Sequence, residues 1–405
     1  MATTVRIEEN KAVKCEFLEP GYTNVSWIGV STAVALIFSP VAGVVIRRFG
    51  LRRCLVSSAI VGGSSICSSA FSTKLWQIYF LWFVAGLAHS FQVGPIMAYV
   101  LIRFRRHRSI ANAFVMSAVP LGTLIFGVII NTLLEVYTWR GTVLITGALA
   151  LNVIPCSLVL RKWNKLRRKE DVLLESEENT QIRLEKEKKT DKPKERCSGC
   201  ITWDSEVLKL PAFMGILFQV FFIYIAVSII YIHMVSGFTD ICKLDLESAR
   251  YLVPYFGASN TVARFIVSII SQHPRIDTFT LFLIVNVLLS VTVAIIPVFE
   301  GFTAAVVLVV IIGIGMSAFS GLTHLVVADI IEYRYLHMAV QYMLLPSGIG
   351  YMVGAPLAGL IFDATGNYIY SFELTAVLVA VSVLIMIPFW VKHIRSLSSE
   401  NSHIL

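Results

Sequence analysis

Long apolar runs fill most of the chain and constrain its fold more than any other feature. Eleven of them approach the roughly 20 residues that a helix needs to cross a lipid bilayer. Only 15% of the 405 residues are charged, compared with about 25% in soluble domains. Because lipid offers the backbone no hydrogen-bond partners, such runs must be helical, and the sequence predicts an all-α membrane protein. The runs lie near residues 26–46, 54–72, 76–102, 109–133, 141–160, 210–236, 250–271, 278–299, 302–327, 338–362 and 369–391.

Positive residues mark one set of loops between these runs. Arginines crowd residues 47–53 and 103–108, thirteen Lys or Arg lie within 161–196, and the alternate loops carry few. Loops rich in Lys and Arg stay in the cytoplasm, so this pattern predicts that the three segments are cytoplasmic. The same loops explain the net charge of +8, which therefore gives no reason to expect a nucleic-acid partner.

The charged middle segment divides the runs into five before it and six after it. Two membrane halves with related folds are the plan of many secondary transporters, and here the first half is one helix short. Either the chain begins after the first helix of such a transporter, as in a splice form or a truncated gene prediction, or it has eleven spans, or one span is misread. The predicted organisation is an extracellular segment at 1–25, an amino-terminal membrane half at 26–160, a charged cytoplasmic loop at 161–208, a carboxy-terminal membrane half at 209–391 and a cytoplasmic tail at 392–405.

One arginine lies inside an apolar run. Arg264 falls within the run at 250–271, and Asn260 precedes it by one helical turn on the same face. Burying a guanidinium in hydrocarbon costs at least about 3 kcal/mol, so such a residue faces a bundle interior or a wet cavity and marks a functional site. We therefore expect Arg264 to hold a substrate anion, with Asn260 and Tyr255 as lining residues. The alternative is a side chain that extends to the lipid headgroups at the end of its helix.

Two polar residues in the third run are further candidates for the substrate path. His89 lies near the middle of the run and Gln92 follows three residues later on the same face. An imidazole at that depth either lines a path or carries protons, or it is a neutral histidine bonded to a helix carbonyl.

Charged residues at the cytoplasmic ends are candidates for a mouth and a gate. Arg106, His107 and Arg108 either gather anions at the mouth or contact lipid headgroups. Arg48 and Arg52 carry the charge of the first loop. A later helix end contributes Asp329, which is predicted to pair with Arg48 or Arg52 and so to latch the two halves together.

Four stretches resemble the monocarboxylate transporter family of the major facilitator superfamily. They are residues 43–53 (GVVIRRFGLRR), 104–113 (FRRHRSIANA), 137–141 (YTWRG), and 354–359 (GAPLAG) followed by 363–366 (DATG). The last pair is the most specific, and together with the apolar runs these stretches cover the chain apart from its charged loop. The resemblance implies a helical bundle of two pseudo-symmetric halves. It places the first residues of the chain after the family's first helix.

The resemblance also implies a function. It points to secondary transport of monocarboxylates or related small organic anions across the plasma membrane by alternating access. In some such transporters a single-span immunoglobulin-like accessory protein assists. Members that cotransport protons have an Asp and an Arg four residues apart in the eighth helix, whereas this sequence has Asn260 and Arg264. The resemblance therefore implies that Arg264 binds the substrate anion. It does not imply that Asn260 carries a proton, since an amide does not titrate.

Other classes of function lack support in the sequence. No span carries a nucleophile beside its base, so an enzyme is not expected, and no cofactor motif is present. Cys197 and Cys200 have zinc-ligand spacing without a second pair, so no metal site is expected. The alternative to a transporter is a non-transporting binding or regulatory protein, because a bundle without its first helix lacks one wall of the central cavity.

Overall fold

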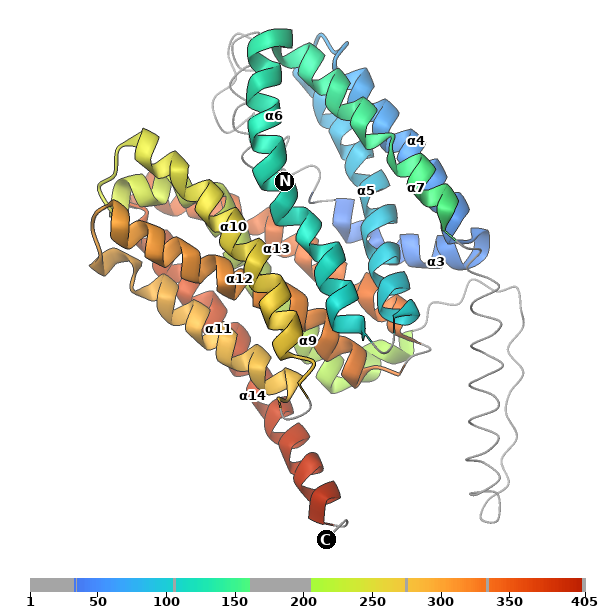
Figure 1. Ribbon diagram of the computed structural model, residues 1–405, viewed down its shortest axis with the longest axis vertical. Helices are drawn as coiled ribbons and strands as arrows, with labels where there is room; N and C mark the ends of the chain where they lie inside the picture. The colour runs from blue at the N-terminus through green and yellow to red at the C-terminus, as the bar shows by residue number, and fades with distance from the viewer. Residues whose placement is uncertain are drawn as a thin grey trace.

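The computed structural model describes residues 33, 35–104, 107–160, 205–273, 276–332 and 335–402. Every element within these residues is helical, which confirms the predicted all-α class (Figure 1). The predicted segment at 1–25 and most of the predicted loop at 161–208 lie outside the described residues. The elements are η1 (Ala35–Phe38), α3 (Ser39–Phe49), α4 (Leu51–Ser69), α5 (Leu75–Arg103), α6 (Arg108–Ala150), α7 (Val153–Val159), η3 (Ser205–Lys209), α9 (Pro211–Ile241), α10 (Leu246–Ile270), α11 (Thr278–Ala294), η4 (Ile296–Val298), α12 (Phe302–Ile330), α13 (Leu336–Thr365) and α14 (Ile369–Ser402).

Nine segments of the described residues are long and apolar enough to cross a membrane. They correspond to the nine predicted runs from 76–102 onward. The run at 54–72 becomes α4, whose mean hydropathy is lowered by Arg52, Arg53 and several serines. The run at 26–46 is described only in part, as η1 and most of α3.

The long helix α6 contains one of these segments and most of a second, which continues into α7. Thr138 interrupts it with φ 56° and ψ 174°, so the chain rises through the first part of α6, turns over and returns through α7 (Figure 1). The candidate spans are Arg108–Phe126, before the interruption, and Thr132–Val159, which includes Thr138 near its start. Arg140, just after the turn, donates from Nη1 to the carbonyl oxygen of Ala70 at 2.9 Å, which fastens the turn to the end of α4.

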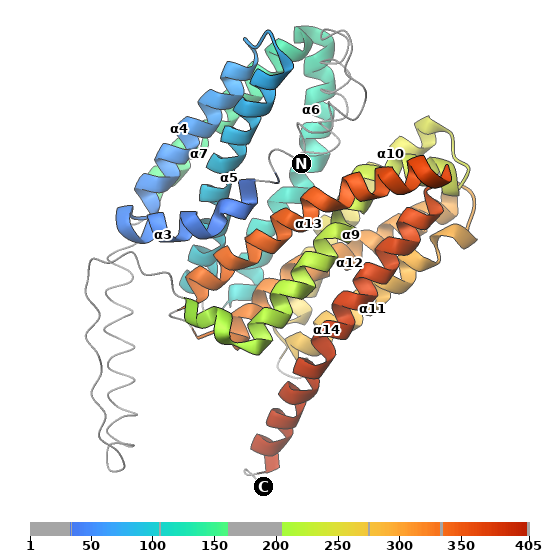
Figure 2. The ribbon, with the colours of Figure 1, turned by 180° about the vertical axis from the view of Figure 1, so that it is seen from behind.

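The helices form two groups, α3 to α7 and α9 to α14. Figures 1 and 2 show that the groups meet toward one end and diverge toward the other. At the meeting end α3 and α5 finish and α4 and α6 begin, and Arg48, Arg52, Arg103 and Arg108 lie there. We call it the basic end. The largest buried apolar cluster lies mainly in the second group.

The two groups are joined along two seams. In one, the start of α6 packs against α10 and α12; in the other, α13 packs against α3 and α5. Gln341 of α13 lies in the second seam, where the hydroxyl of Ser39 donates to its Oε1 at 2.5 Å. A Cβ atom on Gly94 of α5 would lie 2.4 Å from the same oxygen, so the absence of a side chain at Gly94 is what lets Gln341 fit.

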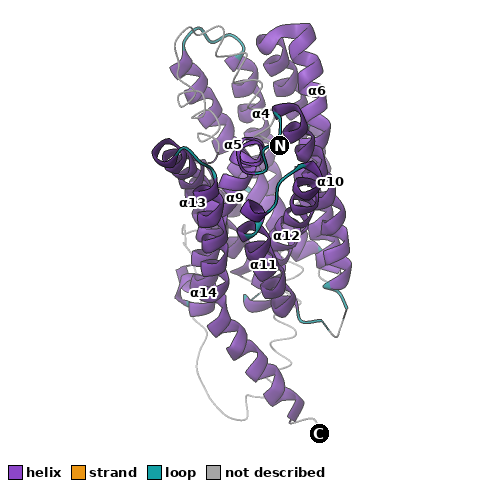
Figure 3. Ribbon diagram, turned by 90° about the vertical axis from the view of Figure 1, so that its left-hand side faces the viewer, coloured by secondary structure: helices purple, strands orange, loops and turns teal. Residues whose placement is uncertain are grey.

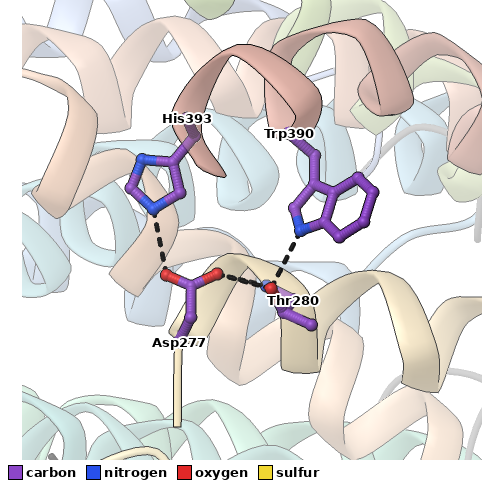
Figure 4. Close-up of polar contacts among 4 residues, drawn as sticks. All are labelled: Asp277, Thr280, Trp390 and His393. Carbon is purple, nitrogen blue, oxygen red and sulfur yellow. Dashed lines mark hydrogen bonds and ion pairs between the residues drawn. The ribbon is translucent and has the colours of Figure 1, made fainter. Parts of the chain in front are cut away.

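The helix α14 continues past the predicted end of its span at 391 and extends beyond the bundle (Figure 3). Polar contacts fix it to the start of α11 (Figure 4). Asp277 caps α11 by accepting from the backbone N–H of Thr280 at 2.8 Å and from its hydroxyl at 2.7 Å. From α14, Trp390 Nε1 donates to that hydroxyl oxygen at 2.8 Å, and His393 Nε2 lies 3.0 Å from Asp277 Oδ1.

The charge of Asp277 is set by two opposing effects. Burial disfavours the ionised carboxylate, but the hydrogen bonds from Thr280 and the contact with His393 outweigh it and hold the pKa of Asp277 below its usual range. Asp277 is therefore ionised at neutral pH, and the residues after 391 begin as an anchored helix rather than a free tail.

Candidate functional site

Arg264 lies on the face of α10 that packs against α6. Its side chain is 5% exposed. Nη1 donates to the carbonyl oxygen of Met116 at 3.0 Å, and Nη2 donates to Oδ1 of Asn260 at 2.9 Å. The guanidinium thus bonds inside the bundle, across the seam between the two groups, rather than extending toward the basic end.

The positive charge of Arg264 has no close negative partner. Within the part of the chain that the structure describes, no carboxylate lies within 4.0 Å of the guanidinium. Two buried donors, Nε of Arg264 and Nδ2 of Asn260, have no hydrogen-bond partner in the described residues. Buried charges and buried donors are normally paired, so these two donors are available to an anion that accepts hydrogen bonds.

Three residues that the sequence reading missed lie around Arg264. Tyr224 and Tyr231 of α9 are both close enough to interact electrostatically with it, and so is His324 of α12. His324 is 6% exposed, and its Nδ1 lies 2.9 Å from the carbonyl oxygen of Ser320. The seven-residue spacing of the two tyrosines, which places them on one helix face, was the signal available in the sequence.

A small cavity adjoins Arg264 on the side of α6 and α12. It measures about 10 Å³, roughly the space that one water molecule needs. Asn112 lies in its wall and donates from Nδ2 to the carbonyl oxygen of Gly321 at 3.1 Å. Asn112 Oδ1 and the hydroxyl of Ser317, also in the wall, have no partner in the described residues. Three residues with unpaired polar atoms, Arg264, Asn112 and Ser317, therefore line one cavity, whereas Asn260 is not among its lining residues.

Polar contacts close the seam between this cavity and the basic end. The hydroxyl of Ser109, at the start of α6, lies 2.8 Å from that of Ser268 and 2.6 Å from that of Ser271, both at the end of α10. Arg108 immediately precedes Ser109, and its Nη1 lies 3.4 Å from Asp329 Oδ1. The predicted gate residue Asp329 therefore joins the two groups, but its partner is Arg108 rather than Arg48 or Arg52.

The structure does not bring every predicted lining residue to Arg264. Tyr255 is 46% exposed, because nine residues at 100° each place it on the opposite face of α10. His89 is exposed and Gln92 is half-buried. On α5, His89 lies five residues before Gly94 and hence about 140° away from the face that contacts α13. Among the predicted site residues that the structure describes, Asn260 alone has a hydrogen bond with Arg264.

The predicted mouth residues lie at the basic end. Arg48 and Arg52 are exposed, and His107 is exposed immediately before α6. Arg108 forms the contact with Asp329 described above. Arg106 lies outside the described residues. Met116, which accepts from Arg264, lies eight residues after Arg108 on α6, so about two helical turns separate Arg108 from the Arg264 contact.

Comparisons with known proteins agree with this architecture. The sequence profile of the Major Facilitator Superfamily matches residues 18–345. Monocarboxylate transporter 13 of Bos taurus is 25% identical over 376 residues, which cover 92% of this chain and 82% of the relative. Human monocarboxylate transporter 2 is 24% identical over 383 residues, covering 90% and 77%.

Among solved structures, the crystal structure of the E. coli fucose:proton symporter superposes with a TM-score of 0.67 at 11% identity, covering 94% of each chain. At that identity the likeness shows the fold alone. The family motifs, the superfamily profile and the curated relatives together confirm the predicted resemblance to monocarboxylate transporters. The chain therefore belongs to the Major Facilitator Superfamily.

Proposed function

We propose that this protein is a secondary transporter that moves a monocarboxylate or a related small organic anion across the plasma membrane by alternating access. The observation that carries the proposal is Arg264, a guanidinium buried between the two groups of helices without a described carboxylate beside it. The names of the relatives, which are monocarboxylate transporters, support the same substrate class.

The unpaired donors define how an anion would bind. A carboxylate has two oxygens that accept from a guanidinium in a forked geometry. Nε of Arg264 and Nδ2 of Asn260 are the donors left over after the contacts within the protein. The hydroxyls of Tyr224 and Tyr231 supply further donors near the same charge. Binding would offset the cost of keeping Arg264 buried, since a paired buried charge is far less unfavourable than an isolated one.

Alternating access requires the seam at the basic end to open. The contacts of Ser109 with Ser268 and Ser271, and of Arg108 with Asp329, would break as the two groups rotate. Arg264 bonds to Met116 across the same seam. A carboxylate that bridges Nε and Nη2 of Arg264 would compete with Asn260 for Nη2, and it would place a negative charge beside the contact to Met116.

Proton coupling at Asn260 is not part of the proposal. An amide does not titrate in the working range, and Asn260 occupies the position beside Arg264. His324 is buried and interacts electrostatically with the guanidinium. Uptake with and without an inward proton gradient, in the unmodified protein and in His324→Gln, tests whether a proton moves with the anion.

The main test is uptake by purified full-length protein in proteoliposomes, with a panel of radiolabelled monocarboxylates that runs from lactate to aromatic acids. We expect saturable uptake of at least one acid and its loss in Arg264→Gln. The matched control is Arg250→Gln, which removes an exposed arginine from the same helix. Binding of an acid without uptake would instead support the non-transporting binding protein. An unchanged rate in Arg264→Gln would remove the proposed site.

The family resemblance adds an accessory partner to the proposal. Some monocarboxylate transporters work with a single-span immunoglobulin-like protein. Affinity purification of the tagged chain from plasma membranes, followed by identification of stoichiometric single-span proteins, tests this part. If the tagged chain is purified from plasma membranes without a stoichiometric single-span protein, the proposed accessory partner is excluded.

A further inference from the structure

A groove lies at the basic end, where α4 begins beside the end of α7 (Figure 1). Its volume is about 670 Å³, within the range of sites that bind small organic molecules. It is separate from the Arg264 site, because its walls come from α3, α4 and α7 of the first group alone. Arginines line its rim, and apolar side chains line its wall.

The rim consists of Arg48, Arg52 and Arg53, all exposed. In the part of the chain that the structure describes, no carboxylate lies within 4.0 Å of any of them. Asp329, the acidic residue expected to pair with two of them, is bound to Arg108 instead. The positive charge at the rim is therefore available to an anionic ligand.

The wall continues from the rim along one stripe of α4. Arg52, Val56 and Ile60 are spaced four residues apart, so they share one face of the helix, and Ile60 is 50% exposed. Eight residues of helix rise about 12 Å. Leu158 of α7, 47% exposed, faces the same groove. A ligand that fits both parts has an anionic head and an apolar chain at least as long as this stripe.

We propose that this groove binds one anionic phospholipid, with its phosphate at the arginines and an acyl chain along Val56, Ile60 and Leu158. Charge complementarity favours an anionic over a zwitterionic lipid, because three cations converge on the head position. The apolar wall favours a lipid over free phosphate, which would leave that wall exposed. Basic pockets beside membrane helices are suited to anionic headgroups, and the predicted orientation places this one in the cytoplasmic leaflet, where such lipids are enriched.

The test is native mass spectrometry of the full-length protein in mixed micelles that contain either phosphatidylserine or phosphatidylcholine. We expect one phosphatidylserine to be retained per protein and phosphatidylcholine to be retained at least tenfold less. Each arginine near a charged membrane surface contributes about a fivefold factor in affinity. The double variant Arg52→Gln/Arg53→Gln should therefore weaken retention about 25-fold.

Two controls separate a built site from general surface charge. Lys392→Gln/Arg395→Gln removes the same charge from α14 and should leave retention unchanged. Ile60→Ser alters only the wall and should weaken retention, and glycerophosphoserine, which has no acyl chains, should fail to compete. The residues changed are exposed, so folding is checked by an unaltered elution profile.

Several results would overturn the proposal. Equal losses in the two double variants would show nonspecific attraction to charge. Full competition by glycerophosphoserine would show a phosphate site without a lipid chain. A tenfold gain in retention after deletion of residues 170–178, an acidic stretch of the middle loop (EDVLLESEE), would show that this stretch, rather than a lipid, fills the groove.

Discussion

Replacing Arg264 with Gln separates a role in binding an anion from a role in holding the fold together. A guanidinium and a carboxylate about 4 Å apart interact by about 4 kcal/mol at an effective dielectric constant near 20. Since about 1.4 kcal/mol corresponds to a factor of ten, Arg264→Gln is expected to weaken anion binding about a thousandfold. The glutamine amide retains a donor for Asn260.

The unliganded protein should respond differently. Removing the guanidinium loses two charge-assisted hydrogen bonds, to Met116 and Asn260, each worth about 1.5–3 kcal/mol. It also removes a desolvation cost of several kcal/mol. These terms oppose each other, so the unfolding temperature of the ligand-free variant should stay close to that of the unmodified protein.

Thermal unfolding in detergent, with and without the transported acid, measures both effects. At an acid concentration of one hundred times the dissociation constant, the unmodified protein should gain about 2.7 kcal/mol of stability. In Arg264→Gln the same concentration would be about a tenth of the new constant, and the gain should fall below about 0.1 kcal/mol. Arg250→Gln should keep the full gain. A variant at Arg264 that retains ligand stabilisation, or loses less than tenfold in affinity, would refute the assigned role.

Three further predictions concern the neighbour of Arg264 and two positions elsewhere in the molecule. Asn260→Asp places a carboxylate 2.9 Å from Arg264, where it would compete with the substrate; uptake should fall at neutral pH and recover on acidification, and a flat pH profile would contradict this. The pKa of Asp277 is depressed in the folded state, so its contribution to stability is complete above its unfolded-state pKa of about 4 and is lost as the pH falls through its lower folded-state pKa. Asp277→Asn should remove this loss of stability from acid unfolding curves. An acid unfolding curve that the substitution leaves unaltered would exclude the contribution. A Cβ on Gly354 would lie 2.4 Å from a backbone carbonyl oxygen of α9, so Gly354→Ala should cost about 1–3 kcal/mol of unfolding free energy. A Cβ on Gly359 would have no atom within 4 Å, so Gly359→Ala should not destabilise the protein. Equal effects of the two substitutions would argue against this packing.

Much of the fold could be predicted because lipid offers the backbone no hydrogen-bond partners, so an apolar run that crosses a membrane must be helical. A run such as 76–102 had to become a helix, and α5 spans Leu75–Arg103. Arg264 and Asn260 could be placed together for a similar reason. Residues four apart share a helix face, and this holds within one helix however the neighbouring helices pack.

The remainder of the site depends on how helices are rotated against one another. Helices that are apolar on nearly every side give only a weak amphipathic signal, so the sequence of α9 did not show which face would meet α10. Tyr224, Tyr231 and His324 were missed for that reason. Tyr255 was assigned to the site by proximity in sequence, although helical geometry alone would have placed it opposite Arg264.

The polar seams between the two groups have a consequence for the energetics of the transport cycle. If Ser109, Ser268, Ser271, Ser39 and Gln341 were replaced by packed apolar side chains, each opening of the basic end would expose their surface to water at a cost proportional to area. Hydroxyl and amide groups instead exchange one hydrogen bond for another with water, at a net cost of about 0.5–1.5 kcal/mol each. In the proposed alternating-access cycle, a seam of this kind would hold the closed and open conformations within a few kcal/mol of each other. At that separation the less stable conformation would remain populated at roughly 0.1–10%, and binding of a single small anion would shift the balance.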